Sequence, residues 1–78
     1  MIENKQFYYG TVIFFKNDPG WGFISKDEWG SDIFVHFSDI NGQKGFRTLK
    51  SNARVKFQIG ETIQGKPKAI NVTVVNDE

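Results

Sequence analysis

Residues 33–37 read Ile-Phe-Val-His-Phe, and this stretch decides the fold. Successive side chains of a β-strand point to opposite faces, so Ile33 and Val35 share one face of the strand. Phe34 and His36 share the other face. Because β-branched aliphatic side chains suit the packed interior of a barrel, we place Ile33 and Val35 inside. The pattern therefore predicts that Phe34 and His36 point into solvent.

The preceding stretch, residues 20–24, reads Gly-Trp-Gly-Phe-Ile and favours the same arrangement. Trp21 and Phe23 fall on one face, whereas Ile24 falls on the face that suits the core. Gly22 marks a point where backbones or large side chains approach closely. The two stretches are expected to form a hairpin, which would bring their outward rings together across neighbouring strands. A surface of adjacent planar side chains is a platform on which nucleic-acid bases can stack.

The opposite assignment, with the rings in the core, is an alternative at this point. It would expose three β-branched aliphatic residues and bury an imidazole. Two later stretches can fill the interior without these rings, because apolar and polar residues alternate in both. Their apolar residues are Val55, Phe57 and Ile59, followed by Ile70, Val72 and Val74. We therefore expect an aliphatic core and an aromatic outer face.

The chain of 78 residues has the length of one domain, which we take as residues 1–78. Helical periodicity is weak, and Gly, Asn and Asp separate short apolar runs. The sequence therefore predicts a meander of antiparallel strands that closes into a barrel. One helical turn should follow the third strand, with Ser38 as its N-cap. The expected strands cover residues 7–16, 21–26, 32–37, 53–59 and 68–75, and the helical turn covers residues 38–40.

Composition and charge indicate a surface partner. Twelve aromatic residues are too many for the interior of so small a barrel, so some rings must be exposed. The net charge is only +1, but residues 44–68 hold seven basic side chains and one acidic one. This part can be locally positive, although a lysine-rich solvated surface without a partner would have the same composition.

Several features that the sequence lacks indicate the cellular compartment of the protein. The chain has no cysteine, no visible signal peptide and no run near the ~20 apolar residues of a membrane span. We therefore expect a cytoplasmic protein that does not bind membranes. So small a core also predicts a marginal free energy of unfolding, about 5 kcal/mol or less.

The two aromatic stretches resemble sequence motifs of the bacterial cold-shock proteins. Residues 20–24 are similar to the first ribonucleoprotein motif of that family, and residues 33–37 are similar to the second. Residues 10–15, 45–49 and 71–72 resemble its opening strand, its aromatic-bearing loop and its last strand. The resemblance covers residues 7–74, with both motifs in order and at the family's spacing. It implies an all-β fold, a five-stranded antiparallel OB-like β-barrel.

The resemblance also implies a function and a set of site residues. The family binds single-stranded RNA and DNA, acts as an RNA chaperone and regulates transcription and translation in the cold. Asp32 matches a residue that hydrogen-bonds a base edge, Lys66 is a looser match to a basic contact, and Lys16 is expected to add a cation. The base-stacking roles fall on Phe14, Phe15, Trp21, Phe23, Phe34, His36, Phe37 and Phe46.

Several positions depart from the family pattern. Ile13 and Pro19 stand where the family has lysines. The log–log salt slope of binding should therefore fall by ~0.7 for each lost phosphate contact. Phe14 replaces a tryptophan, whereas Trp21 replaces a phenylalanine and enlarges the stacking surface. Trp29 is an extra loop aromatic that either extends the platform or covers the end of the hairpin.

Two other classes of function fit parts of the pattern. His36 and Asp39 could form a base with an orienting carboxylate or a pair of metal ligands. One histidine and no cysteine argue against an enzyme, a cofactor or a metal site. A protein-interaction module could use the same aromatic patch. We expect a non-enzymatic monomer that binds single-stranded RNA and DNA, although the sequence also permits a dimer.

Overall fold

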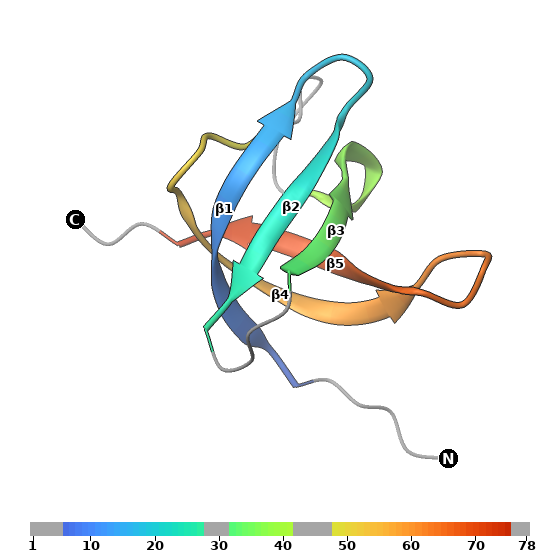
Figure 1. Ribbon diagram of the computed structural model, residues 1–78. Coiled ribbons are helices and arrows are strands. Elements are labelled where there is room, and N and C mark those ends of the chain that lie inside the picture. Colours follow the sequence, from blue (N-terminus) through green and yellow to red (C-terminus); the bar gives the residue numbers. More distant parts are fainter. Residues whose placement is uncertain (1–5, 28–31, 42–47, 76–78) are drawn as a thin grey trace.

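Five strands make up the computed structural model of this protein, which describes residues 6–27, 32–41 and 48–75 (Figure 1). A short 3-10 helix, η1 (Phe37–Asp39), follows the third strand. The expected strands are confirmed, with ends that differ from the expected ones by at most two residues. The strands are β1 (Tyr8–Lys16), β2 (Trp21–Lys26), β3 (Asp32–His36), β4 (Arg54–Glu61) and β5 (Pro67–Val74).

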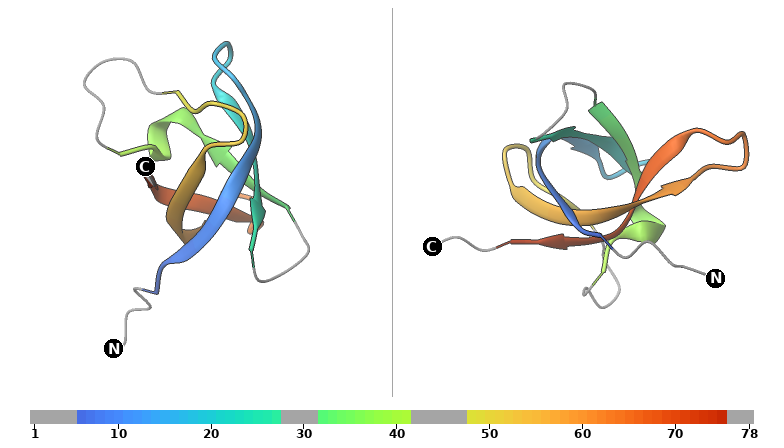
Figure 2. Two further views of the ribbon diagram at one scale, coloured as in Figure 1. Left: turned by 90° about the vertical axis from the view of Figure 1, so that its left-hand side faces the viewer. Right: turned by 90° about the horizontal axis from the view of Figure 1, so that it is seen from below.

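The strands close into a barrel in the order β1-β2-β3-β5-β4, with β4 returning to β1. β1, β2 and β3 form the expected antiparallel meander. The barrel closes where β3 pairs with β5 in a short parallel ladder, which the expected antiparallel meander lacks. In this ladder Phe34 pairs with Lys68 and Val35 pairs with Ala69. It is parallel because β4 pairs with the far side of β1, so β5 returns beside β3 in the same direction. Figure 2 shows the barrel from two further sides, with the hairpin of β4 and β5 projecting beyond it.

The core confirms the expected assignment of faces. Ile24, Ile33 and Val35 are buried, each with no more than 2% of its surface exposed. The aromatic residues on the opposite faces of β2 and β3 stay partly exposed, so the alternative with these rings in the core is wrong. In the described part of the chain the core contains Val12, Ile24, Ile33, Val35, Ile40, Leu49, Val55, Phe57, Ala69 and Val72.

A β-bulge in β1 changes which of its residues face outward. Val12 pairs with Ile24 and Phe14 pairs with Phe23, so Ile13 is an extra residue on the bulged strand. Simple alternation from the buried Val12 would point Phe14 inward. The bulge instead places Phe14 beside Phe23 on the outer face.

β1 and β2 approach each other closely at Gly22. A Cβ atom on this residue would lie 2.1 Å from the carbonyl oxygen of Phe14 and 2.7 Å from the Cα of Phe15. Any larger side chain would push β1 away from β2. The close approach that the sequence predicts at this glycine is confirmed, and it occurs beside the bulge.

A second bulge lies in β5. Lys56 of β4 pairs with Thr73, but Gln58 pairs with Ile70, which leaves an extra residue in β5. Asn71 lies at this point with a φ of 52°, in the left-handed region that Asn tolerates better than most residues. The amide of Asn71 also donates a hydrogen bond of 2.7 Å to the side-chain oxygen of Gln58.

This bulge corrects the expected core. We expected Ile70, Val72 and Val74 to share the inner face, and Val72 is indeed fully buried. Ile70, on the other side of the extra residue, instead lies against Gly60, where an added Cβ would be 3.1 Å from its side chain. Val74 ends the strand and is 50% exposed. One inserted residue therefore breaks the period-two pattern on which the expectation depended.

Candidate nucleic-acid interface

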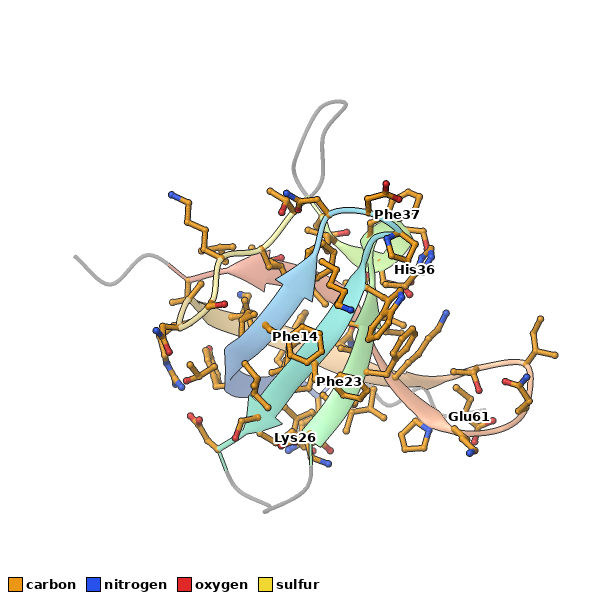
Figure 3. All side chains as sticks on the ribbon, turned by 45° about the horizontal axis from the view of Figure 1, so that its top comes forward. Phe14, Phe23, Lys26, His36, Phe37 and Glu61 are labelled. Atoms are coloured by element: carbon orange, nitrogen blue, oxygen red, sulfur yellow. The ribbon has the colours of Figure 1, made fainter. Side chains whose placement is uncertain are left out.

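Three strands carry most of the predicted contact residues on one outer face, which we call the platform. Cross-strand pairing aligns these residues in two rows. Figure 3 shows Phe14 and Phe23 side by side on β1 and β2, with His36 and Phe37 near the end of β3. The first row of the platform contains Phe14, Phe23 and Phe34, and the second row contains Lys16, Trp21 and His36.

The rings of the platform contact one another at steep angles. The Phe23 ring is inclined by 89° to Trp21 and by 73° to Phe34, with centroids 6.1 and 5.9 Å apart. Phe14 lies 5.8 Å from Phe23 and 5.9 Å from Trp21. Aromatic pairs prefer such tilted contacts, so each ring is held in place by its neighbours. All four rings are half-buried, which leaves part of each ring open to solvent.

Lys16 brings positive charge to the platform. Its Nζ lies 5.4 Å from the centroid of the Trp21 ring, within the range of a cation–π contact. Lys16 is exposed, so the same amino group can also meet a phosphate. A cation and the largest ring of the platform are thus direct neighbours.

His36 and Phe37 continue the aromatic surface at the end of β3. Their ring centroids are 4.6 Å apart with 32° between the ring planes. The backbone N–H of Ser38 donates a hydrogen bond of 3.2 Å to Nδ1 of His36, and the Ser38 Oγ lies 2.8 Å from the same nitrogen. The N-cap of η1 is therefore His36, and our expectation of Ser38 in this role is wrong. Because a neutral imidazole carries one proton, an accepting Nδ1 leaves Nε2 as the donor.

Gly20 sets the position of Phe37. This glycine has a φ of +104°, and a Cβ atom on it would lie 2.6 Å from the Phe37 ring. The Phe37 N–H donates a hydrogen bond of 2.9 Å to the Gly20 carbonyl. The Phe37 ring is 41% exposed beyond this contact. This turn glycine thus also positions an aromatic residue of the candidate site.

A groove of about 450 Å³ borders the first row of the platform, next to the end of the β4–β5 hairpin. It brings together Asp32 and Lys66, two of the three charged contacts expected from the sequence. The hairpin end is held by its own hydrogen bonds, because Thr62 N–H donates to the Lys66 carbonyl (2.7 Å) and Lys66 N–H donates to the Thr62 Oγ1 (3.1 Å). The groove is lined by Phe23, Asp32, Phe34, Thr62, Gln64, Lys66 and Pro67.

Thr62 and Gln64 are candidate contacts that the sequence did not reveal. Both are polar residues of a short turn, and nothing in the local pattern separates them from other turn residues. They reach the platform because β5 closes the barrel on β3. A hydroxyl and an amide can each donate and accept hydrogen bonds, which suits the edge of a base.

The pair His36 and Asp39 does not form a base with an orienting carboxylate here. His36 is engaged with Ser38, whereas Oδ2 of Asp39 lies 3.2 Å from the Nζ of Lys68. Among residues 6–27, 32–41 and 48–75, no three His, Cys, Asp or Glu side chains lie together in a way that could hold a metal ion. The same residues include no helix of the length and apolar character needed to cross a membrane.

A family model described as the 'Cold-shock' DNA-binding domain matches residues 8–75. The chain belongs to the cold-shock domain family. Members of this family generally bind nucleic acid, and the ring-covered face of the barrel is compatible with that activity.

Full-length bacterial relatives have nearly the same size as this cold-shock domain. A cold shock protein of Arthrobacter globiformis is 48% identical over 66 residues, which make up 85% of this chain and 96% of the relative. A cold shock-like protein of Aquifex aeolicus is 43% identical over 68 residues, or 87% and 94% of the two chains. The solved structure titled drosophila Unr CSD456 shares the fold with a TM-score of 0.73 at 22% identity. The match covers 94% of this chain and 28% of that one.

One expected stacking residue, Phe15, does not lie on the platform of this cold-shock domain. Phe15 packs against the core, and its cross-strand partner is the buried Gly22. Because the bulge turns Phe14 outward, the next residue of β1 points inward. We therefore correct the expected placement of Phe15, whereas its stacking role stays a prediction. Phe46 lies outside the described residues, as does Trp29.

Proposed function

We propose that this cold-shock domain binds single-stranded RNA and DNA by stacking bases on the platform, and that it acts as an RNA chaperone and regulator of transcription and translation. The observation that carries the proposal is the pair of cross-strand rows on β1, β2 and β3. Half-buried rings that face solvent and support one another are suited to stack with bases.

The chemistry of the platform favours unpaired strands with little sequence preference. Every base has a π-face, so stacking tolerates many sequences, whereas paired bases of a duplex offer no free face. Stacked bases would leave their phosphates at the edge of the platform, where Lys16 is exposed beside Trp21. A duplex of the same length should therefore be a poor ligand.

The groove beside the first row supports a modest preference on top of stacking. Asp32 can accept hydrogen bonds from base N–H groups when ionised, and Lys66 can donate to base or phosphate oxygens. Both line the same groove as the rings of Phe23 and Phe34. A base stacked there can meet these polar groups with its edge.

A protein that binds unpaired strands without altering them covalently shifts the folding equilibrium of RNA toward open states. This is the physical content of the proposed chaperone role. The contacts of His36 and Asp39 described above fit a binding protein better than a catalyst. We propose that it acts as a monomer in the cytoplasm.

A fluorescence titration with short oligonucleotides tests the proposal. The Trp29→Phe variant leaves Trp21 as its sole indole, so stacking on the platform should quench the remaining emission. We expect quenching by hexamers of U and T, and little by a duplex of equal length. Titrations with hexamers of A and C then measure base preference.

The control separates this proposal from a protein-interaction module. Phe34→Ala in the same background should weaken the binding of both hexamers. If the unaltered platform ignores U and T hexamers, the proposal is wrong and the rings serve a protein partner or the fold itself.

A further inference from the structure

A second group of exposed side chains lies on β1 and on the residue just before it, away from the platform. Phe7 is 43% exposed, Tyr9 is 47% exposed, and Ile13 between Tyr9 and the platform is 43% exposed. Because Gly10 and Val12 are buried on the inner side, alternation places Phe7 and Tyr9 together on the outer side. Large exposed rings on one face of a small domain indicate a binding surface.

The cation on this second surface repeats an arrangement of the platform. The Nζ of Lys56 lies 5.0 Å from the centroid of the Phe7 ring, and Lys56 is the cross-strand partner of Tyr9. On the platform, Lys16 lies 5.4 Å from the Trp21 ring and is the cross-strand partner of Trp21 itself, whereas Lys56 contacts one ring of the second surface and pairs with the other. A ring beside a flexible amino group can stack with a base while the amine meets a phosphate.

β1 connects the two surfaces. Its second half pairs with β2 and carries platform residues, whereas its first half pairs with β4 and carries Tyr9 (Figure 1). At about 3.3 Å per residue, the five residues from Phe14 to Tyr9 span roughly 16 Å along the strand. Nucleotides of one strand of duplex DNA are about 3.4 Å apart along the axis, so a strand with this spacing needs about five nucleotides beyond the platform to reach Tyr9.

We propose that Phe7, Tyr9 and Lys56 form a second contact for single-stranded nucleic acid, which extends the platform along β1 toward β4. The proposal rests on the proposed function, because the same strand of nucleic acid occupies both surfaces. Tyr9 and Phe7 stack with bases, and Lys56 contacts a phosphate. The second contact contributes only when the oligonucleotide is long enough to leave the platform.

Binding to two lengths of oligothymidylate tests this proposal. Hexamers and dodecamers are titrated in excess over the full chain, and each variant is compared with the unaltered protein at the same length. A longer oligonucleotide binds more tightly in part because it can bind in more positions. This gain is the same for the variant and the unaltered protein, so the ratio of their affinities at one length does not contain it. Tyr9→Thr, which keeps a β-branched strand former, should weaken dodecamer binding at least about fivefold and leave hexamer binding unchanged.

Three matched variants sharpen the test. Tyr9→Phe keeps the ring and should bind both lengths like the unaltered protein. Val74→Ala removes a side chain that is apolar and 50% exposed but has no ring, and should change neither affinity. Lys56→Gln should reduce the log–log salt slope by about 0.7 for the dodecamer and not for the hexamer.

The outcomes distinguish the possible errors. Equal losses for both lengths in Tyr9→Thr would overturn the proposal, because the substitution then acts through the platform or the fold. A loss for neither length would overturn it as well. The unaltered protein could also form a concentration-dependent dimer that Tyr9→Thr dissociates. If this occurs with no length-dependent loss of oligonucleotide affinity, the surface binds a second copy of the chain and the proposal is wrong. Failure of Phe34→Ala to weaken hexamer binding would instead refute the function on which this proposal rests.

Discussion

Neighbouring phenylalanines in β1 have different surroundings. Phe14 contacts Trp21 and Phe23 on the platform, whereas the next residue, Phe15, packs against the core. Phe34 lies on the platform as the cross-strand partner of Phe23. A shift of one residue thus decides whether a ring faces solvent or the core, and substitutions can test binding and stability separately.

Alanine at Phe34 and at Phe15 should give opposite results. Phe34→Ala removes a half-buried ring from the platform, so the affinity for a U hexamer should fall by about 1–3 kcal/mol while the domain stays folded. Phe15→Ala should lower the thermal midpoint more than it weakens binding by the remaining folded protein. Fluorescence titration and thermal unfolding measure the two effects. Loss of the fold in Phe34→Ala, with no separate binding defect, would return this ring to the core.

Contacts between elements hold the platform in shape. β1 lies against β2 at Gly22, where even a methyl group would meet the backbone of Phe14 and Phe15. The end of β2 is joined to β4 by Arg54, which donates hydrogen bonds of 2.9 and 2.7 Å to the two carboxylate oxygens of Asp27. Arg54 also donates a hydrogen bond of 3.0 Å to the Thr11 hydroxyl of β1. The contacts at Gly22 and at Asp27 should each contribute to the free energy of unfolding, and substitutions can measure both contributions.

Gly22→Ala should destabilise the domain by at least about 2 kcal/mol, because the backbones of β1 and β2 must separate to admit the methyl group. Gly65→Ala is the matched control. Gly65 has a φ of +85° but no atom within 4 Å of an added Cβ, so only the backbone conformation is penalised, by about 1–2 kcal/mol. Urea unfolding of both variants measures the difference. A smaller loss at Gly22 than at Gly65 would show that the strands separate easily.

The pairing of Asp27 with Arg54 should make part of the stability of the folded state sensitive to acid. The hydrogen bonds and charge of Arg54 hold the pKa of the Asp27 carboxyl below its ordinary value of 3.8. A lowered pKa in the folded state stabilises the protein above pH 3.8, and this stabilisation is lost as the pH falls through the lower folded value. Asp27→Asn should therefore show a shallower fall of the thermal midpoint below pH 4. The effect should be small, because both side chains are exposed at 37% and 43%. If the thermal midpoint falls equally below pH 4 in Asp27→Asn and in the unaltered protein, Asp27 is not the source of the acid sensitivity.

The whole molecule is a small barrel whose stability and ligand binding must be coupled. It has one core in its described part and no cysteine for a disulfide, so its free energy of unfolding should be low. A ligand that binds the folded state at about 100 times its dissociation constant adds about 2.7 kcal/mol. In a domain of this size, each kcal/mol raises the thermal midpoint by about 4–8 °C.

Saturation with a U hexamer should therefore raise the thermal midpoint by about 10 °C or more. The same concentration of duplex should raise it much less, since its bases are paired. Differential scanning calorimetry or circular dichroism measures both shifts. Equal stabilisation by duplex and single strand would mean that charge, and not stacking, dominates binding.

The sequence by itself determined the faces of β2 and β3. A period of two assigns Ile24, Ile33 and Val35 to the core, and a strand without an inserted residue must follow that period. The outward rings of the two strands, and the glycine at which β1 comes close, follow from the same argument. Much of the platform could therefore be predicted from local patterns alone.

Only the tertiary structure decided the rest. The bulges at Ile13 and Asn71 shift the alternation by one residue, which turns Phe14 outward, Phe15 inward and Ile70 away from the core. Such insertions depend on how β1 and β5 fit their neighbours in the closed barrel, and local periodicity does not record that fit. The groove that unites Asp32 with Lys66 exists for the same reason, because strand closure brings together segments that are far apart in the chain.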